Sequence, residues 1–127
     1  MHTRILGGMG WDCYATRNYE EDAETFGLTD DDLAAFKEVA DALRATGCEF
    51  IDADLATGGL NLSGCGDAIE RLTDFNAWAE EPATPEDVTR EARDWGEIGK
   101  QDDPYEANAA AFLRVCVDRG LGIYWSW

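Results

Sequence analysis

The sequence predicts one α+β domain over residues 1–127, with about four helices packed on a small antiparallel sheet of three or four short strands. Several segments carry apolar residues at helical spacing, and a few short stretches alternate between apolar and polar residues. Hydrophobic residues make up 45% of the chain and aromatic residues 11%, which is enough for a packed core. No linker or internal repeat divides the chain, so we expect a single domain.

The clearest helix begins after Thr29. Thr29 can accept a hydrogen bond from the helix start, and Asp32 three residues later completes a pattern that resembles a capping box. Gly47 is placed to end the helix. The apolar stripe predicted for this helix is Leu33, Phe36, Val39, Ala40 and Leu43.

Three more helices are predicted. One covers residues 67–79, where large apolar residues recur about every three positions. The other two begin with proline at the first helical position, at Pro85 and Pro104, and the second of these ends at Gly120. The inward positions predicted for these last two helices are Val88, Ala92 and Trp95, and Ala109, Phe112, Leu113 and Cys116.

Strands are fewer and shorter. Residues 121–127 alternate between apolar and small or polar side chains, which predicts a strand. Residues 48–53 and 60–63 predict two strands joined through Gly58 and Gly59, and residues 3–6 are a further candidate. Residues 7–28 carry no pattern that assigns them.

No motif for catalysis, phosphate binding or metal binding is complete. The glycines at 7–10 match the first two positions of a dinucleotide fingerprint, but Cys13 stands at the third. A calcium loop beginning at Asp52 fails after Asp54, and the four cysteines lack the close spacing of a zinc site. His2 is the only histidine, so a Ser-His or Cys-His pair is not expected. We therefore expect no enzyme activity, no cofactor, no metal and no disulfide.

The charge is the most informative feature for function. Lys and Arg number 10 against 27 Asp and Glu, which gives a formal net charge of −17. Solubility needs a net charge of only about 2 to 8 for a small domain. The charge predicts a basic protein surface as partner, and neither nucleic acid nor an anionic membrane. No apolar run approaches the length of a membrane span and no signal peptide precedes the domain, so we expect a cytoplasmic protein.

The acidic residues occur in runs beside predicted helix starts. Capping explains one or two acids per helix but not runs of this density. Residues 20–32 contain seven acids and no base, so this segment is the best candidate for a partner-binding surface. The predicted contact residues are Glu20, Glu21, Asp22, Glu24, Asp30, Asp31, Asp32, Glu80 and Glu81.

In size and charge, with no catalytic set, the chain resembles the acidic inhibitors with which phages block host restriction and CRISPR systems, some of which are DNA mimics. The resemblance implies a non-catalytic protein that occupies the nucleic-acid-binding surface of a partner, in the host cytoplasm. It extends to no shared motif.

Two alternatives remain. An ordinary cytosolic domain from a salt-loving cell would also be rich in Asp and Glu and poor in Lys, and only two Lys occur here. Such a protein spreads its acids evenly over the surface. The other alternative is a small enzyme or carbohydrate binder that uses carboxylates and an exposed tryptophan, although the spacing of the tryptophans favours core packing for most of them.

Overall fold

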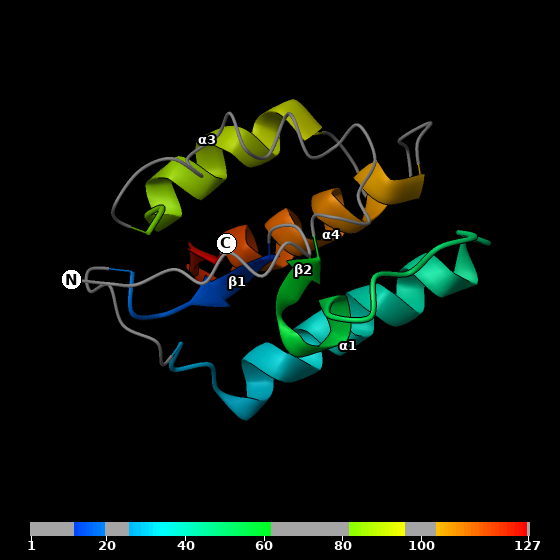
Figure 1. Ribbon diagram of the computed structural model, residues 1–127, viewed down its shortest axis with the longest axis horizontal. Coiled ribbons are helices and arrows are strands. Elements are labelled where there is room, and N and C mark those ends of the chain that lie inside the picture. Colours follow the sequence, from blue (N-terminus) through cyan, green and yellow to red (C-terminus); the bar gives the residue numbers. More distant parts are fainter. Residues whose placement is uncertain (1–11, 20–25, 62–81, 96–103, 127) are drawn as a thin grey trace.

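The computed structural model describes residues 12–19, 26–61, 82–95 and 104–126 (Figure 1). This part of the chain forms an antiparallel sheet with the strand order β2-β1-β3, together with three α-helices. In Figure 1, α4 lies behind the sheet, with α1 and α3 on either side of it. The strands are β1 (Asp12–Thr16), β2 (Gly59–Asn61) and β3 (Gly122–Ser126), the helices are α1 (Asp30–Ala45), α3 (Pro85–Trp95) and α4 (Pro104–Arg119), and η1 (Leu55–Thr57) is a 3-10 helix.

The α+β class is confirmed, with three of the predicted helices present. The fourth predicted helix, at 67–79, and the candidate strand at 3–6 lie outside the described residues. Within the described ranges no helix is both long enough and apolar enough to cross a membrane.

Helix α1 begins and ends as the sequence predicts. The Asp32 amide donates to Thr29 Oγ1 at 3.1 Å, and the Thr29 amide donates to Asp32 Oδ2 at 2.9 Å, so the capping box is complete. Gly47 follows the helix with a φ of +84°, which favours glycine. The predicted stripe is wrong at one position: Leu33 is 37% exposed, and Asp32 occupies the inward position ahead of Phe36.

Helices α3 and α4 both begin at proline, as predicted. The Thr84 amide donates to Asp87 Oδ2 at 3.1 Å and fixes the start of α3. Helix α4 contacts both α1 and α3. Small side chains on α4 let its neighbours approach closely, and the ring centroids of Phe36 and Phe112 lie 5.7 Å apart at the centre of this packing. The buried alanines of α4 are Ala107, Ala109, Ala110 and Ala111.

Strand β1 is the central strand, although the sequence pattern did not assign it. It pairs with β2 through Cys13 and Leu60, and with β3 through Ala15 and Ile123. All four side chains are fully buried. Because side chains alternate across a strand, Asp12 and the other alternate positions of β1 face the opposite side of the sheet.

The prediction of a strand at 48–53 is wrong. The amide of Asp52 donates to Asn108 Oδ1 at 2.8 Å, and Asn108 Nδ2 donates to the Phe50 carbonyl at 3.1 Å. Asn108 is fully buried on α4, so these side-chain bonds replace the ladder bonds that a strand would make. The segment is an irregular loop held against α4 and leads into η1 and β2.

Candidate functional site

Asp32, one of the predicted contact residues, is buried and paired inside the protein. Its carboxylate accepts two hydrogen bonds from Arg17, each 2.7 Å long, and a third from Arg119 Nε. The Asp32 side chain has no exposed surface, whereas those of Arg17 and Arg119 are 37% and 31% exposed. The expectation that Asp32 faces a partner is therefore corrected: the residue joins β1, α1 and the end of α4.

These bonds hold the pKa of Asp32 well below its usual range. The bond from Arg17 contributes most, and those from Arg119 and Thr29 add to it against the opposing effect of burial. The acidic segment 20–32 contains no base, but Arg17 precedes it and Arg119 lies 87 residues after Asp32, so the sequence does not reveal either pair.

Asp30 and Asp31 remain available as predicted contact residues. Both are exposed in the first turn of α1, where their charges also favour the helix dipole. The other predicted contact residues, Glu20, Glu21, Asp22, Glu24, Glu80 and Glu81, lie outside the described residues.

A second group of carboxylates, which sequence reasoning did not single out as a contact surface, lies where β1 begins. We call Asp12, Asp52 and Asp54 the acidic sheet end. Asp52 is 3% exposed and accepts hydrogen bonds from the amides of Asp54, at 2.9 Å, and Asn61, at 3.0 Å. Asp52 thus joins η1 to β2, while Asp12 and Asp54 are only partly buried. The failed calcium loop at Asp52 was the one signal in the sequence that pointed here.

The acidic sheet end carries an electrostatic cost. Burial, and then the charge of Asp54, raises the pKa of Asp12. Burial also raises the pKa of Asp52 and is the largest effect there. The two backbone hydrogen bonds oppose it, and the charges of Asp54 and Asp12 add smaller increases. The Tyr14 hydroxyl has a raised pKa for the same reasons, burial first and then the two carboxylates. Within the described residues, no Lys or Arg forms an ion pair with Asp12 or Asp54.

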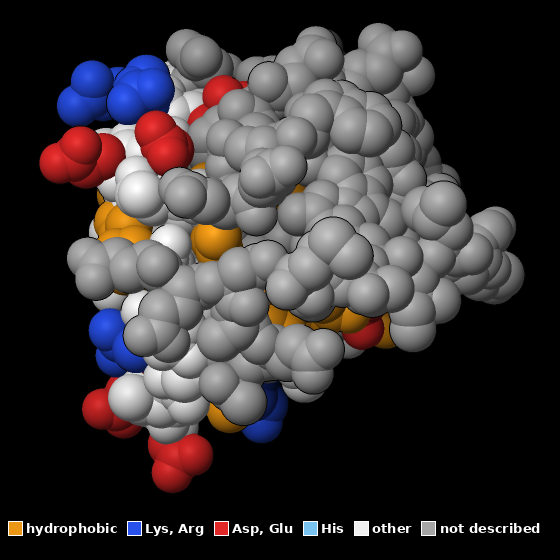
Figure 2. All heavy atoms as spheres, turned by 60° about the vertical axis from the view of Figure 1, so that its left-hand side comes forward, with side chains coloured by type: hydrophobic (Ala, Val, Ile, Leu, Met, Phe, Trp, Pro, Cys, Tyr) orange, Lys and Arg blue, Asp and Glu red, His pale blue; other side chains and the backbone are white. Residues whose placement is uncertain are grey.

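The structure does not bring the two acidic groups together. Asp12 begins β1, whereas Arg17, which binds Asp32 near Asp30 and Asp31, directly follows the end of the same strand. Charges of both signs also mix elsewhere: Arg44 pairs with Asp41 at 2.9 Å on α1. Figure 2 shows acidic and basic groups close to each other along one edge of the molecule, with hydrophobic side chains between them. The described surface is therefore not uniformly anionic, and any contact surface is local.

The remaining chemistry of the described residues is limited. No group of three or more His, Cys, Asp or Glu side chains that could hold a metal occurs among them. Cys13, Cys48 and Cys116 are free thiols, and burial raises the pKa of Cys116 far above its usual value. The glycine run at 7–10, His2 and Cys65 lie outside the described ranges.

We expect the thermal stability to be greatest near pH 4 to 5. Asp12 and Asp52 have raised pKa values in the folded protein, so their contribution is present below the unfolded value of about 3.9 and is lost as the pH rises through the folded values. Asp32 has a lowered pKa, so its contribution is present above about 3.9 and is lost as the pH falls through the folded value. Circular-dichroism melts at constant ionic strength would show the melting temperature rise from pH 7 to about pH 4.5 and fall at pH 2.5.

The matched variants for this profile are Asp12→Asn and Glu49→Gln, which remove one charge each. Asp12→Asn should reduce the rise on acidification, and the exposed Glu49→Gln should leave most of it. A melting temperature that falls steadily from pH 7 to pH 3 in the parent protein would contradict the assignment.

Comparison of the chain with protein-family models, curated proteins and solved structures gave no match.

Proposed function

We propose that this protein is a non-catalytic acidic binding protein that occupies a basic, nucleic-acid-binding surface of a partner protein and blocks it, in the manner of DNA-mimic anti-CRISPR or anti-restriction inhibitors. The observation that carries the proposal is the acidic sheet end in a chain of net charge −17. There the fold holds Asp12 close enough to Asp54 for the charge of Asp54 to raise the pKa of Asp12.

A cationic side chain from a partner would relieve this repulsion. A guanidinium or ammonium group placed between Asp12 and Asp54 gains attraction to both carboxylates, and its charge opposes the rise in the pKa of Asp12. Tyr14 lies beside them on β1 and stacks on Phe26, with ring centroids 5.0 Å apart. Aromatic faces also attract Arg and Lys, so an Arg-rich surface suits this end of the sheet.

Nucleic-acid-binding surfaces supply such cations in rows. Duplex DNA carries one negative charge per about 1.7 Å of its axis, and the proteins that bind it line the contact with Lys and Arg. An acidic protein that covers those side chains prevents DNA from reaching them, and its net charge speeds the encounter. Arg17 and Arg119 are held by Asp32, which reduces the positive charge left to oppose such a partner.

The experiment begins with capture of the partner from the native host, with elution by salt. The eluted partner is then tested for binding to duplex DNA in a gel shift, with and without the acidic protein. We expect the acidic protein to release the DNA and not to bind bare DNA itself. The proposal would be overturned if the acidic protein bound bare DNA or RNA tightly, or if the partner kept its DNA in the presence of the acidic protein.

Three double variants, each raising the charge by two, locate the contact. Neutralising the acidic sheet end with Asp12→Asn and Asp54→Asn should slow association several-fold and weaken its salt dependence. The control changes are Glu38→Gln and Glu49→Gln, at exposed positions elsewhere, and they should have less effect. The third pair, Asp30→Asn with Asp31→Asn, tests the exposed acids in the first turn of α1. Equal losses from all three pairs would indicate a general charge effect and contradict a local contact.

The salt-adapted alternative is favoured by one observation, the mixing of acids and bases along α1, where Lys37 is followed by Glu38 and Arg44 pairs with Asp41. It makes a different prediction. A salt-adapted domain should unfold in low salt, whereas the proposed inhibitor should remain folded there and bind its partner more tightly.

A further inference from the structure

A groove of about 360 Å³ lies between α3 and the end of α4. None of the residues of the acidic sheet end lines it. Pro85 and Val117 give it an apolar lining, and Gly120 leaves room where α4 ends. The remaining lining residues are Glu86, Thr89, Arg90 and Arg93. Its volume is within the range of small-molecule and peptide sites, about 300 to 1,000 Å³.

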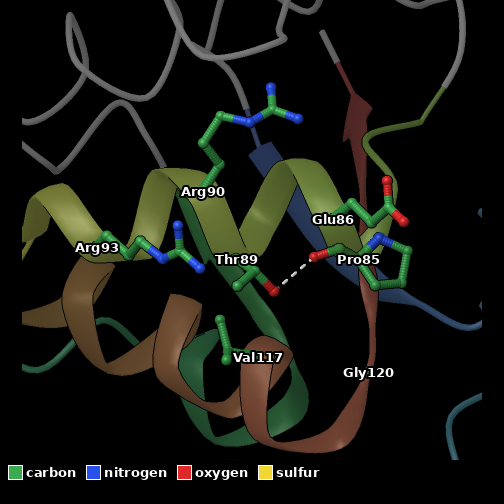
Figure 3. A pocket seen from close by; sticks show the side chains of 7 residues that line it. All are labelled: Pro85, Glu86, Thr89, Arg90, Arg93, Val117 and Gly120. Atoms are coloured by element: carbon green, nitrogen blue, oxygen red, sulfur yellow. Dashed lines mark hydrogen bonds between the residues drawn. The ribbon is translucent and has the colours of Figure 1, made fainter.

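Two arginines and one glutamate, Glu86, line the groove of this strongly acidic protein. Figure 3 shows the guanidinium of Arg93 turned toward Thr89 and Val117, and Arg90 extending outward from α3. Arg90 is 73% exposed and lies 3.5 Å from Asp87, a long pair within the helix. Among the described residues, Arg93 has no hydrogen-bond or ion-pair partner. A cation beside an apolar surface is complementary to a carboxylate beside an apolar group.

The Thr89 hydroxyl donates to the Pro85 carbonyl at 2.8 Å, as the dashed line in Figure 3 marks. This bond is within α3 and orients the threonine methyl and hydroxyl along the groove wall. The Thr89 hydroxyl therefore has no proton left to donate to a ligand. A ligand would be recognised by Arg93 and by the apolar lining.

We propose that this groove binds a peptide segment of a protein partner in which an acidic residue stands next to an aliphatic one. The carboxylate pairs with Arg93, and the aliphatic side chain packs on Val117 and Pro85. A free small anion suits the groove less well, because one exposed ion pair contributes only about 0 to 1 kcal/mol and the net charge of −17 repels anions. A peptide adds contact with the apolar lining, which the anion lacks. This inference does not rest on the proposed function of the acidic sheet end.

The test uses the labelled peptide Gly-Leu-Glu-Leu-Gly-Ser, blocked at both ends, and the full chain. We expect binding with a dissociation constant below about 1 mM, with backbone amide signals in two-dimensional NMR shifting at Thr89, Arg93, Val117 and Gly120. The same peptide with Lys in place of Glu, and the blocked peptide with Ser in place of both Leu, should bind at least five-fold more weakly. Acetate should shift these signals only at much higher concentration.

Arg93→Gln is the main variant, and Arg114→Gln is its matched control, because Arg114 is also an exposed helical arginine. Arg93→Gln should weaken peptide binding about ten-fold, while Arg114→Gln leaves it unchanged. Val117→Thr keeps the shape of the side chain and should weaken binding several-fold by adding a hydroxyl to the apolar lining. Equal loss from both arginine variants, equal binding of the Glu and Lys peptides, or binding of acetate as tight as that of the peptide would each overturn the proposal.

Discussion

Replacing Asp32 by Ala is expected to lower the free energy of unfolding by about 3 kcal/mol. Breaking a buried ion pair typically costs about 3 to 5 kcal/mol, but Arg17 and Arg119 are partly exposed and can be rehydrated, which reduces the loss. The same change removes the Asp32 side chain from the capping box, which adds about 1 kcal/mol. Thermal or urea unfolding followed by circular dichroism measures the effect.

Asp31→Ala is the matched control for this variant. Asp31 is adjacent in the first turn of α1 but exposed, so its loss should cost no more than about 0.5 to 1 kcal/mol. Asp32→Asn keeps an oxygen that can accept from the Thr29 amide but loses the charge, so it should fall between the two. Similar losses of unfolding free energy for Asp31→Ala and Asp32→Ala would show that the ion pairs of Asp32 with Arg17 and Arg119 do not stabilise the fold.

Replacing Gly122 by Ala is expected to cost about 3 kcal/mol, at the upper end of the range for overpacked sites. A Cβ at Gly122 would overlap the Ala83 carbonyl oxygen and would lie 2.6 Å from Tyr19 Cβ. Ala83 cannot move aside easily, because its amide and carbonyl both bond to Ile123, at 2.9 and 3.0 Å. The new methyl group should therefore disrupt the bridge between residue 83 and β3.

Gly47→Ala separates this steric effect from the general cost of replacing a glycine. Nothing lies within 4 Å of a Cβ at Gly47, so the cost there comes from its φ of +84° alone. That cost is about 1 to 2 kcal/mol. Urea unfolding measures both losses of unfolding free energy. A loss for Gly122→Ala no larger than that for Gly47→Ala would contradict the close approach of residue 83 to Gly122.

The helices could be predicted from the sequence because their signals are local. Thr29, Pro85 and Pro104 mark helix starts by their own chemistry, and Gly47 and Gly120 mark helix ends. These signals need no knowledge of the rest of the fold.

The sheet and the sites could be predicted only in part because they depend on distant residues. Strand β1 buries the small side chains Cys13 and Ala15, which carry no strong strand preference, so its assignment depends on pairing with β3. The sequence of residues 48–53 has a strand-like pattern, but in the fold the segment forms hydrogen bonds with Asn108 of α4 and is a loop. In the sequence Asp32 resembles the neighbouring surface acids, and only the fold shows that Arg119, at the end of α4, donates a hydrogen bond to it.

The central position of β1 has a consequence for synthesis of the protein. Both of its neighbours follow it in the chain, and β3 comes after every other described element. While the nascent chain leaves the ribosome, α1 and its capping box can form early, but one edge of β1 stays without a partner until β3 emerges. An unpaired strand edge can pair with another chain. The interval before β3 is made is therefore the stage at which this protein is most exposed to aggregation, and slow long-range pairing extends it.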